Sequence, residues 1–210
     1  MKKVLKTLVF AIGILLITSL GSIVYAQDYI TFNYTVQSGD SLWKICVKNE
    51  VGISELLSVN PQITNPSMIY PSQIIKVPNL AEVKRLAKEV VTLVNQERAK
   101  VGLAPLKDNW QLARVARYKS EDMRDKNYFS HTSPTYGSPF DMMKNFGIKY
   151  MAAGENIAMG QQTAALVMKS WMNSPGHKAN ILGKNFTEIG VGVAKNKSGT
   201  LYWTQMFIGR

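Results

Sequence analysis

The period of the hydrophobic pattern changes along this chain, and that change restricts the fold more than any other feature. Apolar side chains recur at helical spacing through residues 80–173, whereas residues 188–194 and 201–208 alternate at the spacing of β-strands. Gly190 and Gly192 leave one face of the first strand bare, which lets a helix approach closely. Helices followed by strands predict a sheet with helices packed on it, an α+β domain.

The helical part predicts four helices. The first is amphipathic and ends at a glycine, and the second is capped by Asp108 or Asn109. The four are expected at residues 80–101, about 109–126, 140–146 and 163–173.

A smaller unit precedes this one. Thr35 and Val36 fit a short strand, and Ser41 lies in a turn that caps a helix carrying Leu42, Ile45 and Cys46 on one face. A second helix begins near residue 54 and stops before Pro61, and residues 73–77 return as a strand. The expected order is strand, helix, helix, strand.

The first 26 residues are typical of a secretion signal. Three lysines precede an apolar run at residues 8–20, and Val24-Tyr25-Ala26 supplies the small residues of a cleavage site. An uncleaved anchor is the alternative, but the run is short for a membrane span. We expect a secreted protein that begins at residue 27.

The positive charge is concentrated in the larger unit. The formal charge of +11 falls to +8 once the three signal lysines are removed. Residues 27–79 hold three lysines and four acids, or −1, whereas residues 80–210 hold 19 basic and 10 acidic residues, or +9. Such a domain outside the cell attracts anionic wall polymers or anionic lipids, or is simply a solvated surface. No aromatic-basic motif indicates nucleic-acid binding.

Cys46 is the one cysteine, so the chain forms no intramolecular disulfide. It lies in an apolar segment and is predicted to be a small buried hydrophobe. No histidine lies in its domain to activate it as a nucleophile.

Residues 34–78 resemble a LysM domain, a module that binds glycans containing N-acetylglucosamine. The resemblance is carried by YTVQSGDSLW at 34–43, NPQI at 60–63 and IYPSQIIKVP at 69–78. It implies a groove between the loop at 39–42 and the loop from Pro61 to Tyr70. The implied glycan-binding residues are Gly39, Asp40, Ser41, Leu42, Pro61, Gln62, Ile63 and Tyr70.

Residues 80–210 resemble a CAP (SCP-like) domain. The motifs are NQER at 95–98, FSHT at 129–132, GENI at 154–157, WMNSPGH at 171–177, IGVG at 189–192 and WTQ at 203–205. This resemblance implies a three-layer α-β-α sandwich. The form of the WMNSPGH motif is similar to that of bacterial members, which are often secreted, wall-associated or related to sporulation.

The CAP resemblance also implies a shared cleft for His131, Glu155 and His177, the candidate catalytic residues. The two histidines, the only ones in the chain, are candidate ligands for Zn²⁺ or another divalent cation. Many members carry a second glutamate where this chain has Ser174, which weakens the expectation of a metal. The alternative is a hydrogen-bonded network that fixes the loops, with Asn156 holding the adjacent loop.

Other hydrolytic arrangements find little support. Ser130 adjoins His131, but neighbouring side chains rarely face each other. The chain contains neither a Gly-x-Ser-x-Gly turn nor a His-Glu-x-x-His helix.

Three functions remain. The favoured one is a secreted, non-enzymatic cell-wall protein, in which the LysM domain binds peptidoglycan glycan and positions a CAP cleft for a second ligand. The alternatives are a metal-dependent hydrolase of wall or protein substrates, and a protein of spore coat or envelope assembly.

Overall fold

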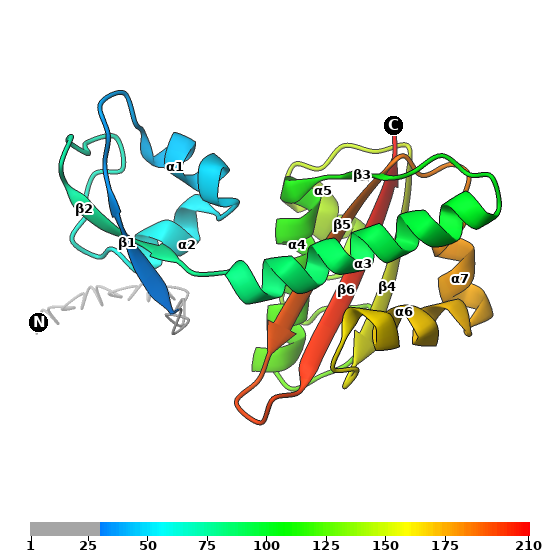
Figure 1. Cartoon of the computed structure of the whole chain (residues 1–210). Helices are drawn as coiled ribbons and strands as arrows, with labels where there is room; N and C mark the ends of the chain where they lie inside the picture. Colours follow the sequence, from blue (N-terminus) through cyan, green and yellow to red (C-terminus); the bar gives the residue numbers. More distant parts are fainter. Residues whose placement is uncertain (1–29) are drawn as a thin grey trace, which may run out of the picture.

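The computed structural model describes residues 30–210, which form a small N-terminal and a larger C-terminal domain (Figure 1). The predicted signal peptide at 1–26 lies outside the described residues. The small domain contains β1 (Thr31–Thr35), α1 (Leu42–Asn49), α2 (Ile53–Ser58) and β2 (Ile74–Pro78). Strands β1 and β2 pair antiparallel, from Thr31 opposite Pro78 to Thr35 opposite Ile74. The predicted order of strand, helix, helix and strand is confirmed.

The first strand begins four residues earlier than Thr35, where the sequence placed its start, and it excludes Val36. Residues 31–35 read Thr-Phe-Asn-Tyr-Thr and alternate polar with aromatic side chains, so the strand signal was present in the sequence ahead of Thr35. Val36 is buried just beyond the strand, and its N–H donates to the carbonyl of Gln73. Ser41 caps α1 as predicted, since its hydroxyl accepts from the N–H of Lys44.

The large domain has nine elements. They are α3 (Ala81–Lys100), β3 (Lys107–Asp108), α4 (Trp110–Asp125), α5 (Pro139–Asn145), β4 (Ala152–Met159), α6 (Ala164–Met172), α7 (Pro175–Ile181), β5 (Glu188–Lys195) and β6 (Leu201–Gly209). The sheet order is β3-β5-β6-β4, with β3 parallel to β5 and the other pairs antiparallel. The four expected helices and both late strands are present, whereas β3, β4 and α7 were not predicted.

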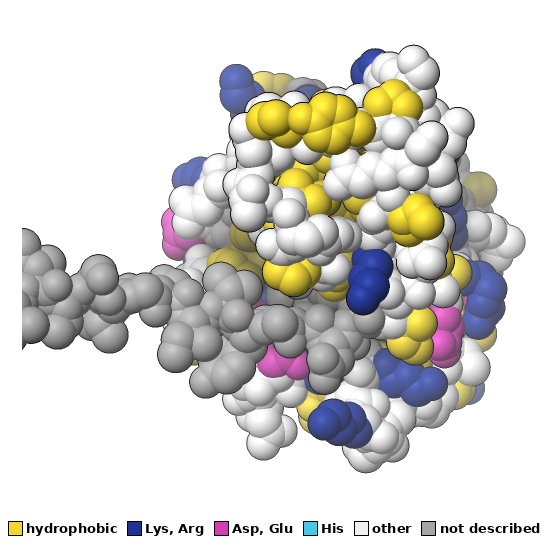
Figure 2. Space-filling view, turned by 90° about the vertical axis from the view of Figure 1, so that its left-hand side faces the viewer, with side chains coloured by type: hydrophobic (Ala, Val, Ile, Leu, Met, Phe, Trp, Pro, Cys, Tyr) yellow, Lys and Arg dark blue, Asp and Glu magenta, His cyan; other side chains and the backbone are white. Residues whose placement is uncertain are grey.

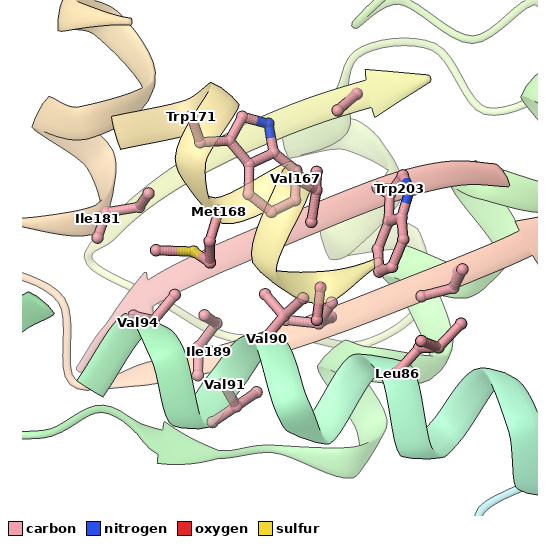
Figure 3. Close-up of a cluster of buried hydrophobic side chains, with 14 of the residues drawn as sticks. Leu86, Val90, Val91, Val94, Val167, Met168, Trp171, Ile181, Ile189 and Trp203 are labelled. Atoms are coloured by element: carbon pink, nitrogen blue, oxygen red, sulfur yellow. The ribbon is translucent and has the colours of Figure 1, made fainter. Parts of the chain in front are cut away.

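Helices cover both faces of this sheet. In Figure 1, α3, α6 and α7 lie in front of the strands, and α4 and α5 lie behind them. The front core joins α3, α6 and the sheet through the side chains that Figure 3 labels, among them Val90, Met168, Trp171 and Trp203. A separate cluster packs α4 and α5 against β6. The predicted three-layer α-β-α sandwich is confirmed. No helix among residues 30–210 is long and apolar enough to cross a membrane.

Two glycines let the rear helix touch the sheet. A Cβ built on Gly192 would lie 2.0 Å from the backbone nitrogen of Arg117, and one on Gly190 would lie 2.3 Å from that of Ala113. Both contacts are with helix backbone, which cannot move aside as a flexible side chain could. The close approach that the sequence predicted is therefore present between β5 and α4.

A buried ion pair joins the two domains. Glu55 of α2 binds Arg117 of α4, with 2.7 Å between its Oε1 and the arginine Nη1, and Arg117 also binds Glu121. Tyr118 and the backbone N–H of Gly52 donate to Oε2 of Glu55 at 2.7 and 2.6 Å. Every polar atom of the Glu55 carboxylate is thus used at the junction. Nearby, Lys84 of α3 forms an ion pair with Glu50.

Candidate functional sites

The structure places the two predicted LysM loops side by side. Beyond the last pair of the β1–β2 ladder, the N–H of Ser72 donates to the carbonyl of Val36, and Val36 donates to Gln73. The first loop follows Val36, and the second loop ends at Tyr70 just before these bonds. The first loop therefore starts, and the second loop ends, at the same end of the two-stranded sheet.

Asp40 shapes the first loop. Its Oδ2 accepts from the N–H of Gln37 at 2.8 Å and from the hydroxyl of Tyr34 at 2.9 Å. These two hydrogen bonds lower the pKa of Asp40, in that order of importance. Gly39 precedes it with φ of 83°, a conformation that side chains rarely adopt. Gly39 and Asp40 thus maintain the turn that presents the loop backbone.

Asn60 fixes the start of the second loop. Its buried side chain donates to the carbonyls of Leu56 and Lys76 and accepts from the N–H of Lys76. Gln62 then donates to Oδ1 of Asn60 at 3.1 Å. The loop is therefore tied to β2 and α2 before it reaches the surface.

The eight candidate glycan residues divide into two groups. Leu42 and Ile63 are buried in the small core and support the loops from beneath. Tyr70 is 59% exposed, and Met68 beside it in the same loop is 53% exposed. Pro61, Gln62, Gly39 and Ser41 are also exposed, and Asp40 is partly so. Figure 2 shows hydrophobic side chains among uncharged atoms on the outer face of this domain.

In the large domain, His131 and Glu155 form a hydrogen-bonded pair. Nδ1 of His131 lies 2.8 Å from Oε1 of Glu155, a residue of β4. The imidazole is 54% exposed, whereas the carboxylate is 1% exposed. No described group donates a hydrogen bond to Oε2 of Glu155, and burial raises the pKa of this carboxyl. The pair thus consists of an exposed imidazole held by a buried carboxylate, one oxygen of which accepts no hydrogen bond from the described residues.

Lys119 of α4 lies beneath this pair and was not predicted. Its side chain is fully buried, and Nζ donates to the carbonyl of His131 at 2.7 Å and to the hydroxyl of Tyr128 at 3.3 Å. Burial lowers the pKa of Lys119, and the charges of Glu155 and Asp122 act in the opposite direction. Lys119 thus holds the backbone at His131 and supplies a positive charge that favours the ionised form of the buried Glu155.

Asp122, one helical turn further along α4, fixes the rest of the His131 loop. Its Oδ2 accepts from Tyr128 at 2.7 Å and from Ser133 at 2.6 Å, and its Oδ1 accepts from Thr135. Burial raises the pKa of Asp122, but these hydrogen bonds outweigh it, and the pKa is lowered. The loop that carries His131 is therefore held at both ends by one helix.

The second histidine lies on α7, close enough to His131 for the charge of one to act on the other. Asn156 donates to the carbonyl of His177 at 3.1 Å, and Asn180 of α7 donates to the side chain of Asn156 and the carbonyl of Glu155. Burial lowers the pKa of His177, and the charge of His131 lowers it further. Asn156 is fully buried and fixes the adjacent loop, in agreement with the sequence prediction.

The donor set for a metal is small. Among residues 30–210, no group of three or more His, Cys, Asp and Glu side chains is arranged to hold a metal ion. Glu155 is bonded to Nδ1 of His131. This is the position of a carboxylate that orients a histidine ligand, not that of a metal ligand itself. This part of the domain thus offers two imidazoles, one fewer than the three protein ligands usual for catalytic zinc.

Two further candidates are structural. The hydroxyl of Ser130 accepts from the N–H of Thr132, and the side chain is not bonded to His131. Cys46 is a buried free thiol whose pKa burial raises to about 11, as expected of a small core residue.

Comparison with known proteins identifies both domains. Residues 91–207 match the model of CAP, the Cysteine-rich secretory protein family, and residues 34–78 match the LysM domain. The chain belongs to the CAP family and carries a LysM domain ahead of its CAP domain.

Similar proteins include the uncharacterized protein YkwD of Bacillus subtilis, which is 59% identical over 130 residues, 62% of this chain and 49% of YkwD. The crystal structure of an extracellular protein containing an SCP domain from Bacillus anthracis is 31% identical, with a TM-score of 0.58, and the match covers 76% of this chain and 50% of that one. The LysM region is 48% identical over 46 residues to SpoIVD-associated factor A of Bacillus subtilis, 22% of this chain and 12% of that protein.

The chain thus spans about half the length of the first two of these relatives. The pairing of a LysM domain with a CAP domain supports a cell-wall-associated, extracellular protein.

Proposed function

We propose that this protein is secreted, binds the N-acetylglucosamine glycan of peptidoglycan through its LysM loops, and presents its CAP cleft to a second ligand at the wall. The observation that carries the proposal is the pairing of two anchored loops at one end of the β1–β2 sheet. Turn backbone and the side chain of Gln62 supply hydrogen-bonding groups for an N-acetyl group. The exposed ring of Tyr70 supplies an apolar face for a sugar.

Sedimentation with purified peptidoglycan sacculi tests the glycan part. The protein from residue 27 onward should pellet with sacculi, and soluble N-acetylglucosamine oligomers should compete. Tyr70→Ala combined with Gln62→Ala should weaken binding about tenfold or more, since both side chains are exposed in the loop. Phe140→Ala, which removes an exposed ring from the CAP domain, is the matched control. Equal binding by the double variant and the control contradicts the proposal.

The His131–Glu155 pair favours a second candidate function, a hydrolase. A buried carboxylate that orients an exposed imidazole resembles the arrangement of a general base. The test is release of soluble muropeptides from sacculi, with and without zinc or a chelator. Release that is lost in His131→Ala with His177→Ala makes the cleft an active site. No release, with the protein in the pellet, leaves a wall-binding protein.

The setting of the proposed function includes spore formation. The LysM region resembles not only SpoIVD-associated factor A but also the spore coat assembly protein ExsA of Bacillus cereus, at 46% identity over 46 residues. Each match covers only the LysM part of this chain. A deletion strain that forms normal spores would count against this setting.

A further inference from the structure

A groove lies where the two domains meet. It has a volume of about 480 Å³ and is lined by Phe32, Lys48, Asn49, Pro78, Asn79, Leu80, Ala81, Lys84, Arg85 and Lys88. These residues come from β1, the end of α1, the end of β2, the linker and the first two turns of α3. We refer to it as the junction groove. It lies at the Thr31–Pro78 end of the small sheet, opposite the end that bears the LysM loops.

The charged lining of the junction groove is entirely positive. Four of the ten lining residues are Lys or Arg, and no Asp or Glu lines the groove. Lys84 is paired with Glu50, and Arg85 is 3.5 Å from the exposed Glu89. Within residues 30–210, no carboxylate forms an ion pair with Lys48 or Lys88.

The cations come from both domains. Lys48 stands on α1 with Nζ 5.0 Å from the centre of the Tyr34 ring, and Lys88 stands on α3. Because the Glu55–Arg117 pair fixes the domains against each other, these cations keep their spacing across the groove. The amides of Asn49 and Asn79 add neutral hydrogen-bonding groups among them.

We propose that the junction groove binds a segment of an anionic polymer whose charges are phosphodiesters. Several cations spaced along a groove fit a repeating charge rather than a single small anion. Three of the four cations are lysines, which bind phosphate oxygens as point charges, and Arg85 can bind a phosphate through two N–H groups. This inference goes beyond the glycan function proposed above and relies on it only for the location at the wall.

Sacculi with and without their phosphodiester polymers test the proposal. Hydrofluoric acid cleaves phosphodiesters and leaves the glycan strands. At low salt, the protein from residue 27 onward should bind untreated sacculi about tenfold more tightly than treated ones. Raising the salt from about 0.05 to about 0.5 M should remove that advantage, since the contacts are exposed to solvent.

The key variant combines Lys48→Gln, Arg85→Gln and Lys88→Gln, and leaves Lys84 with its partner Glu50. It should bind treated and untreated sacculi equally. The control combines Lys144→Gln, Lys149→Gln and Lys197→Gln, which remove the same charge from exposed positions elsewhere. The control should keep the preference of the unaltered protein, and both variants should unfold at the same temperature as that protein.

Three outcomes overturn the proposal. Equal loss in both triple variants would show an effect of net charge without a site. If the unaltered protein shows no preference for untreated sacculi, the phosphodiester polymer is excluded as the ligand of the groove. Binding to phosphatidylglycerol vesicles that depends on the three residues, without the sacculus preference, would assign the groove to lipid headgroups. If the unaltered protein does not bind treated sacculi, only the proposed glycan binding of the LysM domain is contradicted.

Discussion

Glu55 of the LysM domain and Arg117 of the CAP domain form an ion pair in which both side chains are 6% exposed. A second acid, Glu121, binds the same guanidinium, and the hydroxyl of Tyr118 donates a hydrogen bond to Oε2 of Glu55. A pair this buried is costly to break, because removal of one charge leaves the other without its partner. The LysM domain is therefore seated on α4 in one orientation rather than tethered by a loose linker.

Glu55→Gln should lower the free energy of unfolding by about 2 kcal/mol, because the amide keeps the shape and loses the charge opposite Arg117. Urea unfolding at pH 7 measures this loss. Glu89→Gln, which removes one member of an exposed pair, should change it by less than about 0.5 kcal/mol. Equal effects of the two changes would show that the buried pair does not hold the junction.

The same variant has a defined pH dependence. Burial raises the pKa of Glu55, but the charge of Arg117 and the hydrogen bonds outweigh it, and the pKa lies below 4.5. The stability that Glu55 contributes is therefore fully present above pH 4.5 and is lost as the pH falls through the folded-state pKa. The difference between Glu55→Gln and the unaltered protein should shrink in acid.

Gly192→Ala should destabilise the CAP domain by several kcal/mol, since its Cβ would lie 2.0 Å from the backbone of Arg117. Thermal unfolding of a soluble preparation, or its failure to fold, reports this. Gly176→Ala meets no atom within 4 Å and has a small expected effect. A tolerated Gly192→Ala would contradict the close packing of β5 and α4.

His177 should titrate below pH 6.5 in an NMR titration that follows its ring. Burial and the neighbouring His131 lower the pKa of His177 below 6.5. Its contribution to stability is therefore present above pH 6.5 and is lost as the pH falls from 6.5 through the folded-state pKa. In His131→Ala, the second of these causes is gone, so His177 should titrate at a higher pH than before. An unchanged His177 titration in that variant would show that the charge of His131 does not act on His177.

Glu155→Gln tests the buried carboxylate of the cleft. Burial raises its pKa above 4.5, so the unaltered protein loses stability as the pH rises from 4.5 through the folded-state value. The amide keeps an acceptor for His131 and does not ionise. The variant should therefore gain stability relative to the unaltered protein over this range, as urea unfolding at several pH values would show. Parallel pH profiles would contradict a raised pKa at Glu155.

Cys46 should not react with a thiol reagent at pH 8 while the protein is folded. Its thiol is fully buried, and burial raises its pKa to about 11. The rate of modification should rise once urea unfolds the small domain. Rapid reaction without denaturant would indicate that the LysM core opens readily.

The sequence predicted the elements whose residues follow one simple period. The helix at α3 and the strands at β5 and β6 have regular apolar spacing, and their places were predicted to within one or two residues. Strand β4 was missed because Glu155 and Asn156, adjacent and both buried, break the alternation. They are buried because His131 and Asn180 supply hydrogen-bond partners, which a periodic pattern cannot express.

Lys119 and the Glu55–Arg117 pair were not predicted from the sequence, for a related reason. Leu112, Ala116 and Met123 form a buried apolar face of α4, and Lys119 occupies the same face, three residues after Ala116. A lysine on an apolar stripe was the available signal for a buried cation. Glu55 and Arg117, by contrast, belong to different domains, and nothing in either pattern connects them. Only the docking of the domains brings them together.

Strand β6 lies between β4 and β5, and all nine of its residues are buried. Strands β4 and β5 each pair with β6 and make no ladder with each other, so β6 alone joins them in the sheet. The sheet therefore cannot be completed until residues 201–209 are present. Because β6 follows both of its neighbours in the chain, the central strand of the CAP sheet is also the one that completes it.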